Sequence, residues 1–343
     1  MNIEQITKEI NLALRHQVQG LTAQINEIDE QLILVSDSLS DYLSEGKRFR
    51  ALFAVLGFLG ADGKLSSEIF RAVSALELLQ ASALIHDDLI DDSDTRRGKA
   101  AIHKQFAIKH GEKFGTSAAI LIGDLALIWS EQVLQNSGIK QSKMSQCGQI
   151  FSEMRNELMA GQLLDIFEQT QSGFSIERSL KIARFKSGKY SIERPLHFGA
   201  ALSDSSDLQN IYTVYSDFGL PLGEAFQLRD DLLGIYGDPH ITGKPAGDDL
   251  REGKKTALIA YAFERGSNSV RDLIQSKLGT PLSQIEIEQL IMAINETGAV
   301  AHIENLIEKL SESALDSLSQ ANINQSARKM LEQMVELVTK RNR

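Results

Sequence analysis

Cysteine is nearly missing from this chain of 343 residues: Cys147 is the only one, so an intrachain disulfide framework is excluded. Its single thiol fits a reducing compartment, and we interpret Cys147 as a filler of the core. No run reaches the ~18 consecutive apolar residues of a spanning helix; the best candidate, 51–61, is far too short. The start of the chain lacks the basic stretch of a signal peptide. These absences predict a cytoplasmic protein without a transmembrane segment.

Proline and basic charge are also in short supply. The chain has 5 prolines, whereas Ala, Leu, Glu, Gln and Ile are frequent, which is typical of helices, and alternating strand patterns are absent. The formal net charge of −10 argues against a nucleic-acid partner, because phosphate backbones attract basic surfaces. Hydrophobic residues, at 42%, can fill a sizeable core. The composition therefore predicts a globular all-α protein.

Apolar residues recur at helical spacing in eight segments. These segments are 3–14, 25–43, 49–59, 69–90, 117–134, 144–167, 208–233 and 300–338. Breaks rich in glycine or polar residues lie at 61–63, 98–115, 171–173 and 237–253. None of these breaks is long enough to be an interdomain linker. We therefore expect one domain over 1–343, a bundle of helices.

Two acidic clusters stand out. The first follows the apolar segment 72–85 and places Asp87, Asp91 and Asp94 at i, i+4 and i+7, so we expect three carboxylates on one helix face. The second is Asp230-Asp231. Oxygen donors at this density suit Mg²⁺, which takes one or two carboxylates and completes its shell with water and substrate phosphate. A solvated acidic helix end is the alternative, and the magnesium interpretation predicts a phosphate ester as substrate.

Basic patches accompany the carboxylates in this acidic chain. Lys47 and Arg50, at i and i+3, are expected on one helix face near its start, where free N–H groups and the helix dipole attract anions. The other patches are Arg96-Arg97, Lys186-Ser187, and Lys244 with Lys254-Lys255. Structural ion pairs are the alternative for Arg96 and Arg97, and a solvated surface role is the alternative for Lys189 and Lys255.

The order and spacing of these motifs resemble the trans-isoprenyl diphosphate synthase (polyprenyl synthetase) family over residues 40–260. The motifs are Gly46-Lys47-Arg48-x-Arg50, Asp87-Asp88-x-x-Asp91, Arg96-Arg97-Gly98, Gly161-Gln162-x-x-Asp165, Lys186-Ser187, Gln227-x-x-Asp230-Asp231 and Gly253-Lys254-Lys255-Thr256. Two further stretches, 186–196 and 243–251, are similar to the actinobacterial geranylgeranyl diphosphate synthases. The resemblance implies the isoprenoid synthase type I fold, a helical bundle around a central apolar cavity, with the terminal helices packed on the motif core.

The resemblance also implies a reaction and its components. The reaction is the Mg²⁺-dependent head-to-tail condensation of isopentenyl diphosphate with an allylic diphosphate, dimethylallyl, geranyl or farnesyl, with release of diphosphate. Geranylgeranyl diphosphate is the expected product, and a longer polyprenyl or a farnesyl diphosphate is the alternative. About three Mg²⁺ ions per active site and a homodimer are typical of the family. The remote alternatives are a class I terpene cyclase and a noncatalytic partner subunit of a synthase.

Carried over motif by motif, the resemblance assigns roles to residues. The expected Mg²⁺ ligands are Asp87, Asp91 and Asp230, supported by Asp88, Asp165 and Asp231. The groups expected at the allylic diphosphate, which act in catalysis, are Arg96, Lys186, Lys244 and Lys254, with Ser187 and Gln227 giving hydrogen bonds. The residues expected to hold isopentenyl diphosphate are Lys47, Arg50, Arg97 and Gln80. His86 is not assigned as a base, because in the family the released diphosphate takes the proton.

Product length is expected to depend on the helix before Asp87. Ser82 and Ala83 lie five and four residues earlier, roughly 6 to 7.5 Å along the helix, and both are small. Leu79 continues the wall, and Trp129 is either its floor or ordinary core. One departure from the family concerns the second acidic motif, where many relatives carry a third aspartate and this chain has Gly234.

Overall fold

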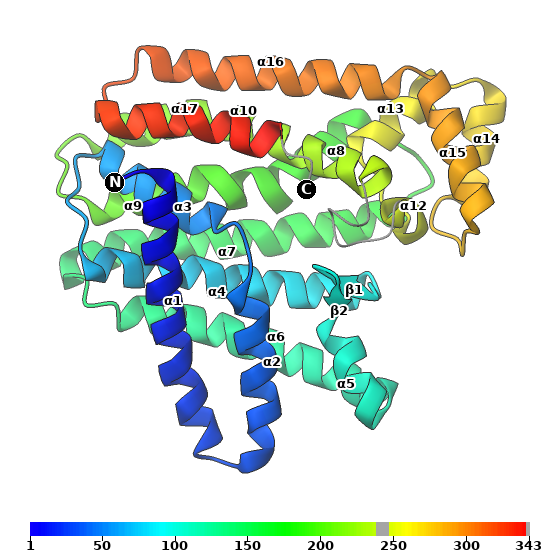
Figure 1. Ribbon diagram of the computed structural model, residues 1–343. Helices are drawn as coiled ribbons and strands as arrows, with labels where there is room; N and C mark the ends of the chain where they lie inside the picture. The colour runs from blue at the N-terminus through cyan, green and yellow to red at the C-terminus, as the bar shows by residue number, and fades with distance from the viewer. Residues whose placement is uncertain (238–246, 341–343) are drawn as a thin grey trace. The chain divides into compact units, whose positions relative to one another are not determined.

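Helices make up nearly all of the regular structure in the computed structural model, which describes residues 1–237 and 247–340 (Figure 1). The all-α prediction is therefore confirmed. The chain divides into two compact units, each assembled from separate stretches. Unit 1 comprises Met1–Ile150, Pro195–Tyr212 and Ile323–Met330, and unit 2 comprises Phe151–Arg194, Thr213–Asn322 and Leu331–Arg343. That the whole chain forms one domain stays a prediction.

Unit 1 is built around one long apolar helix. Its elements are α1 (Ile3–Asn26), η1 (Glu30–Leu32), α2 (Ile33–Ser44), α3 (Phe49–Gly60), α4 (Ser67–Ile90), β1 (Thr95–Arg96), β2 (Lys99–Ala100), α5 (Ile102–His110), α6 (Glu112–Gln135), the start of α7 (Gln141–Gln169) and α9 (Arg194–Leu202). More than half of the residues of α4 are buried, on all sides, because α1, α3 and α6 pack against it. A helix that is apolar all round is central, and α4 thereby fixes the position of the aspartates at its end.

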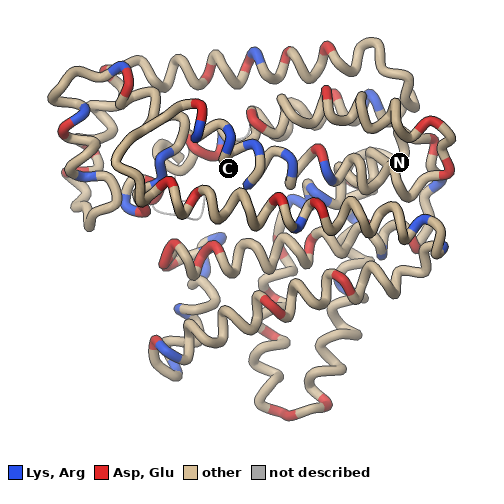
Figure 2. Tube along the Cα trace, turned by 180° about the vertical axis from the view of Figure 1, so that it is seen from behind, with Lys and Arg blue, Asp and Glu red and all other residues tan. Residues whose placement is uncertain are grey.

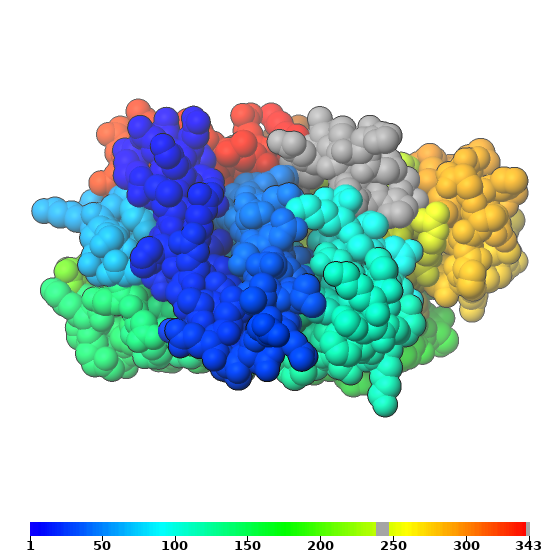
Figure 3. Space-filling model, turned by 60° about the horizontal axis from the view of Figure 1, so that its bottom comes forward, coloured from blue at the N-terminus to red at the C-terminus, as the bar shows by residue number. Residues whose placement is uncertain are grey.

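The first helices form a hairpin that covers one side of α4. α1 begins with a capping box between Asn2 and Gln5, and a single apolar stripe, including Ile6, Ile10 and Leu14, is buried. In Figure 3, α1 and α2 (dark blue) lie across the face turned to the viewer, with the segment around α5 (cyan) beside α2. The buried Cys147, within α7, confirms its interpretation as core.

Unit 2 has a separate apolar core. Its elements are the rest of α7, α8 (Ile176–Ala183), the π-helical segment η2 (Arg184–Glu193), most of α10 (Leu208–Tyr236), α12 (Asp248–Glu252), α13 (Ala257–Arg265), α14 (Asn268–Lys277), α15 (Gln284–Glu296), α16 (Ala299–Ser319) and most of α17 (Gln325–Thr339). Buried residues from α10 and from α12 to α16 form one cluster, with Leu232, Leu250 and Leu258 among them. Each fully buried leucine contributes about 1.5–3 kcal/mol.

Several predicted helix boundaries were wrong. The segment 25–43 is two helices, because α1 ends at Asn26 and the Asp29 side chain caps η1 before α2. The segment 300–338 is likewise split into α16 and α17. The predicted break at 98–115 contains β2 and α5, whose apolar residues are too few for a periodic signal. The helices between α7 and α10, and from α13 to α15, were not predicted.

Two described helices, α4 and α6, are long and apolar enough to cross a membrane by length and composition. The most apolar window of α4 is 72% buried inside the structure, and that of α6 is 44% buried. Central helices of globular cores have the same composition. The expectation that no segment spans a membrane stays a prediction.

Candidate active site

The first acidic motif lies at the carboxyl end of α4. The helix ends at Ile90, and Asp91 is its C-cap, with its N–H donating to the Asp87 carbonyl at 2.9 Å. The Asp87 and Asp91 side chains are partly exposed, whereas Asp88 is 1% exposed. α4 therefore presents Asp87 and Asp91 one helical turn apart, which is the arrangement that the sequence predicts.

Arg96 binds the buried member of this motif. Its guanidinium donates from Nε to both Asp88 carboxylate oxygens, at 2.9 and 3.1 Å, and from Nη2 to one of them, and Nη2 lies 3.9 Å from Asp87. Although burial opposes the charge, the Asp88 carboxylate holds the Arg96 pKa above its ordinary value. Figure 2 shows acidic and basic residues together where α4 ends. The ion-pair alternative for Arg96 therefore holds in this structure, and Asp88 fixes a cation beside Asp87.

The expectation that Asp94 shares the Asp87 face was wrong. Asp92 has a positive φ of 51°, so the chain has left the helix before Asp94. The carboxylates of Asp92 and Asp94 are 80% and 84% exposed and lie 2.7 and 3.5 Å from the Lys104 amine. The first motif thus contributes two partly exposed carboxylates, from Asp87 and Asp91.

A tight hairpin places Arg97. β1 and β2 pair antiparallel, and the two turn residues, Arg97 and Gly98, both have positive φ (54° and 74°), as a type I′ turn requires. The Arg97 guanidinium donates to the backbone carbonyls of Tyr42 (3.1 Å) and Glu45 (2.7 Å) and lies 5.5 Å from the Tyr42 ring centroid. A Cβ added to Gly46 would lie 3.3 Å from Arg97. The hairpin therefore brings Arg97 to the Gly46–Arg50 motif, as the resemblance implies.

The cations of that motif have different surroundings. α3 begins at Phe49, and Arg48 before it has a left-handed φ of 57°, so Lys47 precedes the helix. The expectation that Lys47 and Arg50 share a helix face was therefore wrong. Lys47 is exposed, with its amine 5.6 Å from the Phe49 ring centroid, and Arg50 is partly buried on α3. Both remain predicted ligands of isopentenyl diphosphate.

Arg48 is a structural residue that sequence reasoning missed. Its side chain is buried, 3.5 Å from the buried Glu77 carboxylate of α4, and donates to Asn11 (2.8 Å) and to the Leu43 carbonyl. Burial lowers the pKa of Arg48, and the negative charge of Glu77 acts in the opposite direction. Glu77 also accepts from the Ala51 N–H at 3.2 Å. This buried pair attaches the start of α3 to α4.

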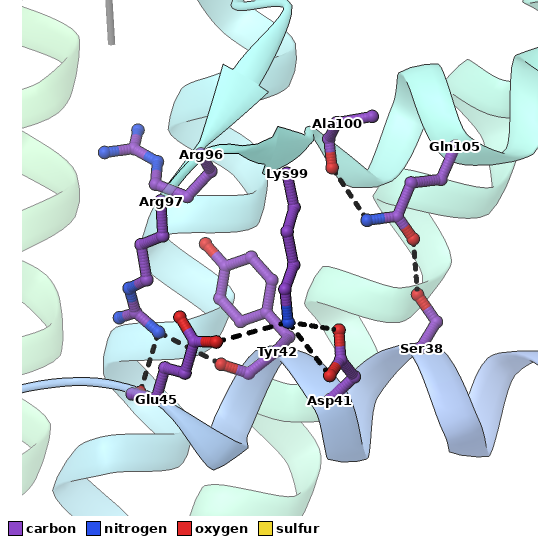
Figure 4. Close-up of a pocket in the computed structure, with 9 residues that line it drawn as sticks. All are labelled: Ser38, Asp41, Tyr42, Glu45, Arg96, Arg97, Lys99, Ala100 and Gln105. Atoms are coloured by element: carbon purple, nitrogen blue, oxygen red, sulfur yellow. Dashed lines mark hydrogen bonds and ion pairs between the residues drawn. The ribbon is translucent and has the colours of Figure 1, made fainter. Parts of the chain in front are cut away.

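A polar pocket adjoins the hairpin (Figure 4). Its lining residues are Ser38, Asp41, Tyr42, Glu45, Arg96, Arg97, Lys99, Ala100 and Gln105. The Lys99 amine lies 2.9 Å from Asp41 and 3.2 Å from Glu45. Arg96 and Arg97 leave the hairpin in different directions. Consecutive arginines therefore serve two different places, the first acidic motif and the Gly46–Arg50 motif.

The residues expected to gauge product length lie along α4. Ser82 and Leu79 are fully buried, whereas Ala83 and Gln80 are partly exposed. Gln80, Ala83 and Asp87 follow i, i+3, i+7 spacing, so they share one face of α4. Trp129, on α6, is 3% exposed. All four chain-length assignments and the Gln80 assignment remain predictions, with Ala83 on the more open face.

His86 contacts α6. Its Nε2 lies 3.1 Å from the Ile120 carbonyl and 3.6 Å from Asp124. A Cβ on Gly123 would overlap the imidazole, so glycine is needed there for this contact. These contacts give His86 a packing role.

In unit 2, the π-helical segment η2 carries Lys186 and Ser187. The Lys186 amine lies 2.7 Å from the Asp165 carboxylate of α7. A Cβ on Gly161 would overlap the Lys186 backbone, and one on Gly223 would lie 2.5 Å from the Gly188 Cα. η2 is therefore in backbone contact with α7 and α10, and π-helical segments are frequent at functional sites. Gly223 thus allows α10 to approach η2 closely.

Glu157 of α7 holds the second half of η2 and was not predicted. Its carboxylate accepts from Lys189 Nζ at 2.5 Å and from Arg194 Nε and Nη2 at 2.6 and 2.7 Å. Burial raises the Glu157 pKa, but the bonds from Arg194 and Lys189 prevail, so its pKa lies below the ordinary value. Lys189 is therefore an ion-pair partner rather than a solvated surface residue.

We predict that Glu157→Gln lowers kcat more than it raises KM, because it loosens η2 without removing a cation. Removing the negative charge of an acceptor that binds two cations is expected to lower kcat roughly tenfold, which corresponds to ~1.4 kcal/mol. Glu153→Gln is the matched control, since Glu153 lies on α7 at 3.8 Å from Arg194. Steady-state kinetics with both diphosphates varied would measure the two constants, and equal effects of the two variants would contradict the prediction.

The second acidic motif lies on α10. Asp230 is partly exposed, whereas Asp231 is 5% exposed and accepts from Gln227 Nε2 at 2.7 Å. Burial raises the pKa of Asp231 to about 8. The hydrogen bond from Gln227 acts in the opposite direction. The negative charges of Asp249, Asp230 and Asp165 raise this pKa further. Gln227 thus orients Asp231 in this structure, and its predicted role at the ionising carbon stays a prediction.

The remaining basic residues of unit 2 follow α12. The Lys254 amine binds Glu252 and lies 3.6 Å from Asp249. The Lys255 amine donates to the carbonyls of Gln171 and Gly173 and lies 4.9 Å from the Phe174 ring centroid, so it has a structural role. The predicted Lys244 lies outside the described residues.

The donor set fits Mg²⁺ that enters with a diphosphate. Among the described residues, no three His, Cys, Asp or Glu side chains group closely enough to hold a metal by themselves. Mg²⁺ in phosphate sites needs one or two carboxylates, with phosphate oxygens and water for the rest. Asp87 and Asp91 offer such carboxylates near Arg96, and Asp230 offers a partly exposed carboxylate in unit 2.

Comparison with known proteins identifies the class. The polyprenyl synthetase family model matches residues 34–294, so the chain belongs to this family. It is a prenyltransferase of the polyprenyl diphosphate synthase type, as the resemblance implied.

Individual relatives are named after products of different chain length. A crystal structure of geranylgeranyl pyrophosphate synthase from Corynebacterium glutamicum, complexed with isoprenyl diphosphate and magnesium, is 36% identical with a TM-score of 0.95, covering 99% of this chain and 100% of that one. Geranylfarnesyl diphosphate synthase of Aeropyrum pernix is 29% identical, covering 86% and 90%. Octaprenyl diphosphate synthase of Escherichia coli is 27% identical, covering 93% of each chain. The names thus span several chain lengths.

Proposed function

We propose that this chain catalyses the Mg²⁺-dependent condensation of isopentenyl diphosphate with allylic diphosphates and that its final product is geranylgeranyl diphosphate. The full-length similarity to the Corynebacterium glutamicum synthase carries the product assignment. Two diphosphates are supported by the hairpin, where Arg96 binds Asp88 of the first acidic motif while Arg97 lies against Gly46. A terpene cyclase needs one diphosphate site, so the second set of cations favours a synthase.

Each group has a defined task in this proposal. Asp87 and Asp91 of unit 1 and Asp230 of unit 2 bind Mg²⁺, and Asp88, Asp165 and Asp231 support them. Bound Mg²⁺ supplies positive charge that stabilises the leaving diphosphate. Lys186 and Lys254, each fixed by a carboxylate, neutralise the same anion, as Arg96 does. Preoriented cations of this kind lower the barrier because they need not reorganise during the reaction.

The second substrate is held by unit 1. The exposed Lys47, the partly buried Arg50 and the hairpin residue Arg97 bind isopentenyl diphosphate, with Gln80 as a hydrogen-bond donor. The double bond of isopentenyl diphosphate attacks the allylic cation, and loss of a proton gives an allylic product five carbons longer. Because the product is again an allylic diphosphate, the cycle repeats until the chain meets its limit.

A homodimer in a cytoplasmic setting completes the proposal. One face of α6 exposes Phe114, Leu121 and Ile128 at seven-residue spacing, with 48%, 67% and 61% of each residue accessible. Large apolar residues exposed repeatedly along one helix face favour an interaction site. Sedimentation equilibrium tests the dimer, which would have twice the chain mass of 37.9 kDa.

Chain-length analysis tests the product assignment. Purified protein with Mg²⁺ and isopentenyl diphosphate is supplied separately with dimethylallyl, geranyl or farnesyl diphosphate, and the products are separated by mass. We expect geranylgeranyl diphosphate as the longest main product from all three starters. Accumulation of farnesyl diphosphate, or of products longer than geranylgeranyl, would overturn the product assignment and leave the synthase class intact.

Ala83→Phe is expected to shorten the product, because Ala83 shares the partly exposed α4 face with Gln80 and Asp87. Ser82→Phe is predicted to do the same, but Ser82 is fully buried, so overpacking also costs roughly 1–3 kcal/mol of stability. Product analysis and thermal unfolding separate the two effects. A product spectrum unchanged by Ala83→Phe would show that the growing chain does not pass this face.

A further inference from the structure

The space beside Gly234 on α10 is occupied by another residue's carboxylate. A Cβ built on Gly234 would lie 2.5 Å from Cγ and 3.0 Å from Oδ1 of Asp249, and it would overlap Oδ2. A side chain at position 234 would therefore require the Asp249 carboxylate to shift from this position. The sequence alone shows only that the family's third aspartate is missing here.

Position 234 lies on the face of α10 that carries the second acidic motif. Asp230 and position 234 are separated by four residues, so they lie one above the other at a spacing of about 6 Å. The Asp249 carboxylate, in contact with Gly234, is thus one helical turn from Asp230. This is the place that a third aspartate of the motif would reach.

The fold holds Asp249 in this position. α12 is bracketed by Gly247 and Gly253, both in left-handed conformation with φ of 77° and 76°. The neighbouring Leu250 is fully buried in the cluster that includes Leu232 of α10. α12 is therefore anchored to α10 by the residue next to Asp249, and the contact with Gly234 follows from this packing.

The charges around Asp249 also suit a role in the motif. Its carboxylate is 14% exposed, and Lys254, a predicted diphosphate ligand, lies 3.6 Å away. The Asp249 carboxylate therefore lies beside a cation that is itself expected at the allylic diphosphate.

We propose that Asp249 supplies the third carboxylate of the second acidic motif in place of a side chain at Gly234, and that it helps to bind the Mg²⁺ that accompanies the allylic diphosphate. This inference rests on the proposed function. It names a Mg²⁺-binding residue 15 positions after Gly234 in the sequence.

The test measures Mg²⁺ binding in the presence of inorganic diphosphate by titration calorimetry on the full chain. Asp249→Ala is expected to weaken Mg²⁺ binding about tenfold or more, the equivalent of ~1.4 kcal/mol. Asp248→Ala is the matched control, because Asp248 precedes Asp249 on α12 and lies 3.9 Å from Arg251. It is expected to bind Mg²⁺ within about twofold of the wild type. Thermal unfolding of each variant checks the fold.

A reciprocal exchange makes the test specific. Gly234→Asp alone is expected to lower the unfolding temperature, because its side chain collides with Asp249. The double variant Gly234→Asp, Asp249→Ala is expected to recover most of the Mg²⁺ affinity lost in Asp249→Ala. Unchanged affinity in Asp249→Ala, or a double variant no better than Asp249→Ala, would overturn the proposal. Product formation by the wild type tests the proposed function separately, since it does not depend on either variant.

Discussion

Replacing Asp87 by alanine lowers kcat by about 10³-fold or more, and Asp230→Ala does the same. The expected loss, about 4 kcal/mol or more, follows from removing charge stabilisation of the leaving diphosphate at the step where negative charge develops. Both side chains are partly exposed, Asp87 in the last turn of α4 and Asp230 within α10, so we expect the fold to be retained. Single-turnover rates at saturating Mg²⁺ and both diphosphates measure the effect.

The first motif offers its own control for this prediction. Asp94→Ala removes a carboxylate from the same stretch, but Asp94 is 84% exposed and lies next to Lys104. We expect near wild-type turnover from Asp94→Ala. Turnover of Asp87→Ala close to that of Asp94→Ala would remove Asp87 from the proposed Mg²⁺ site.

Glu77→Ala lowers the free energy of unfolding by about 3–5 kcal/mol, the second large effect that we expect, because it leaves Arg48 buried and without its carboxylate. The Ala51 N–H loses an acceptor as well. Denaturant titration followed by circular dichroism measures the loss. Glu68→Ala, on the exposed start of α4 with Arg71 as its partner, is the control and is expected to change stability little.

Replacing both members of the buried pair separates charge from packing. Arg48→Met combined with Glu77→Leu removes both charges and keeps apolar volume, so most of the stability is expected to return. A double variant as unstable as Glu77→Ala would show that the hydrogen bonds to Asn11 and Leu43, rather than the unpaired charge, dominate.

Local spacing in the sequence predicted what lies on a single helix. Asp87 and Asp91 are one turn apart at the end of α4. The Asp94 prediction failed because helical spacing was extended past the end of the helix, where Asp92 takes a left-handed conformation. The prediction that Lys47 shares a helix face with Arg50 failed for the same reason, because Lys47 precedes the start of α3.

Contacts between distant segments could not be predicted from spacing. The Arg48–Glu77 pair joins two helices, and Glu157 holds two cations more than 30 residues away. Gly234 was visible as a missing aspartate, but the carboxylate that fills its place comes from another helix. Such pairings depend on how helices such as α10 and α12 pack against each other. No periodic pattern in the sequence indicates that packing.

The most direct test of the proposed synthase activity is its dependence on two diphosphates. A labelled allylic diphosphate is incubated with the protein and Mg²⁺, with and without isopentenyl diphosphate, and organic products are identified by mass. We expect a longer prenyl diphosphate only when isopentenyl diphosphate is present. A cyclic hydrocarbon formed from the allylic diphosphate alone would contradict this expectation.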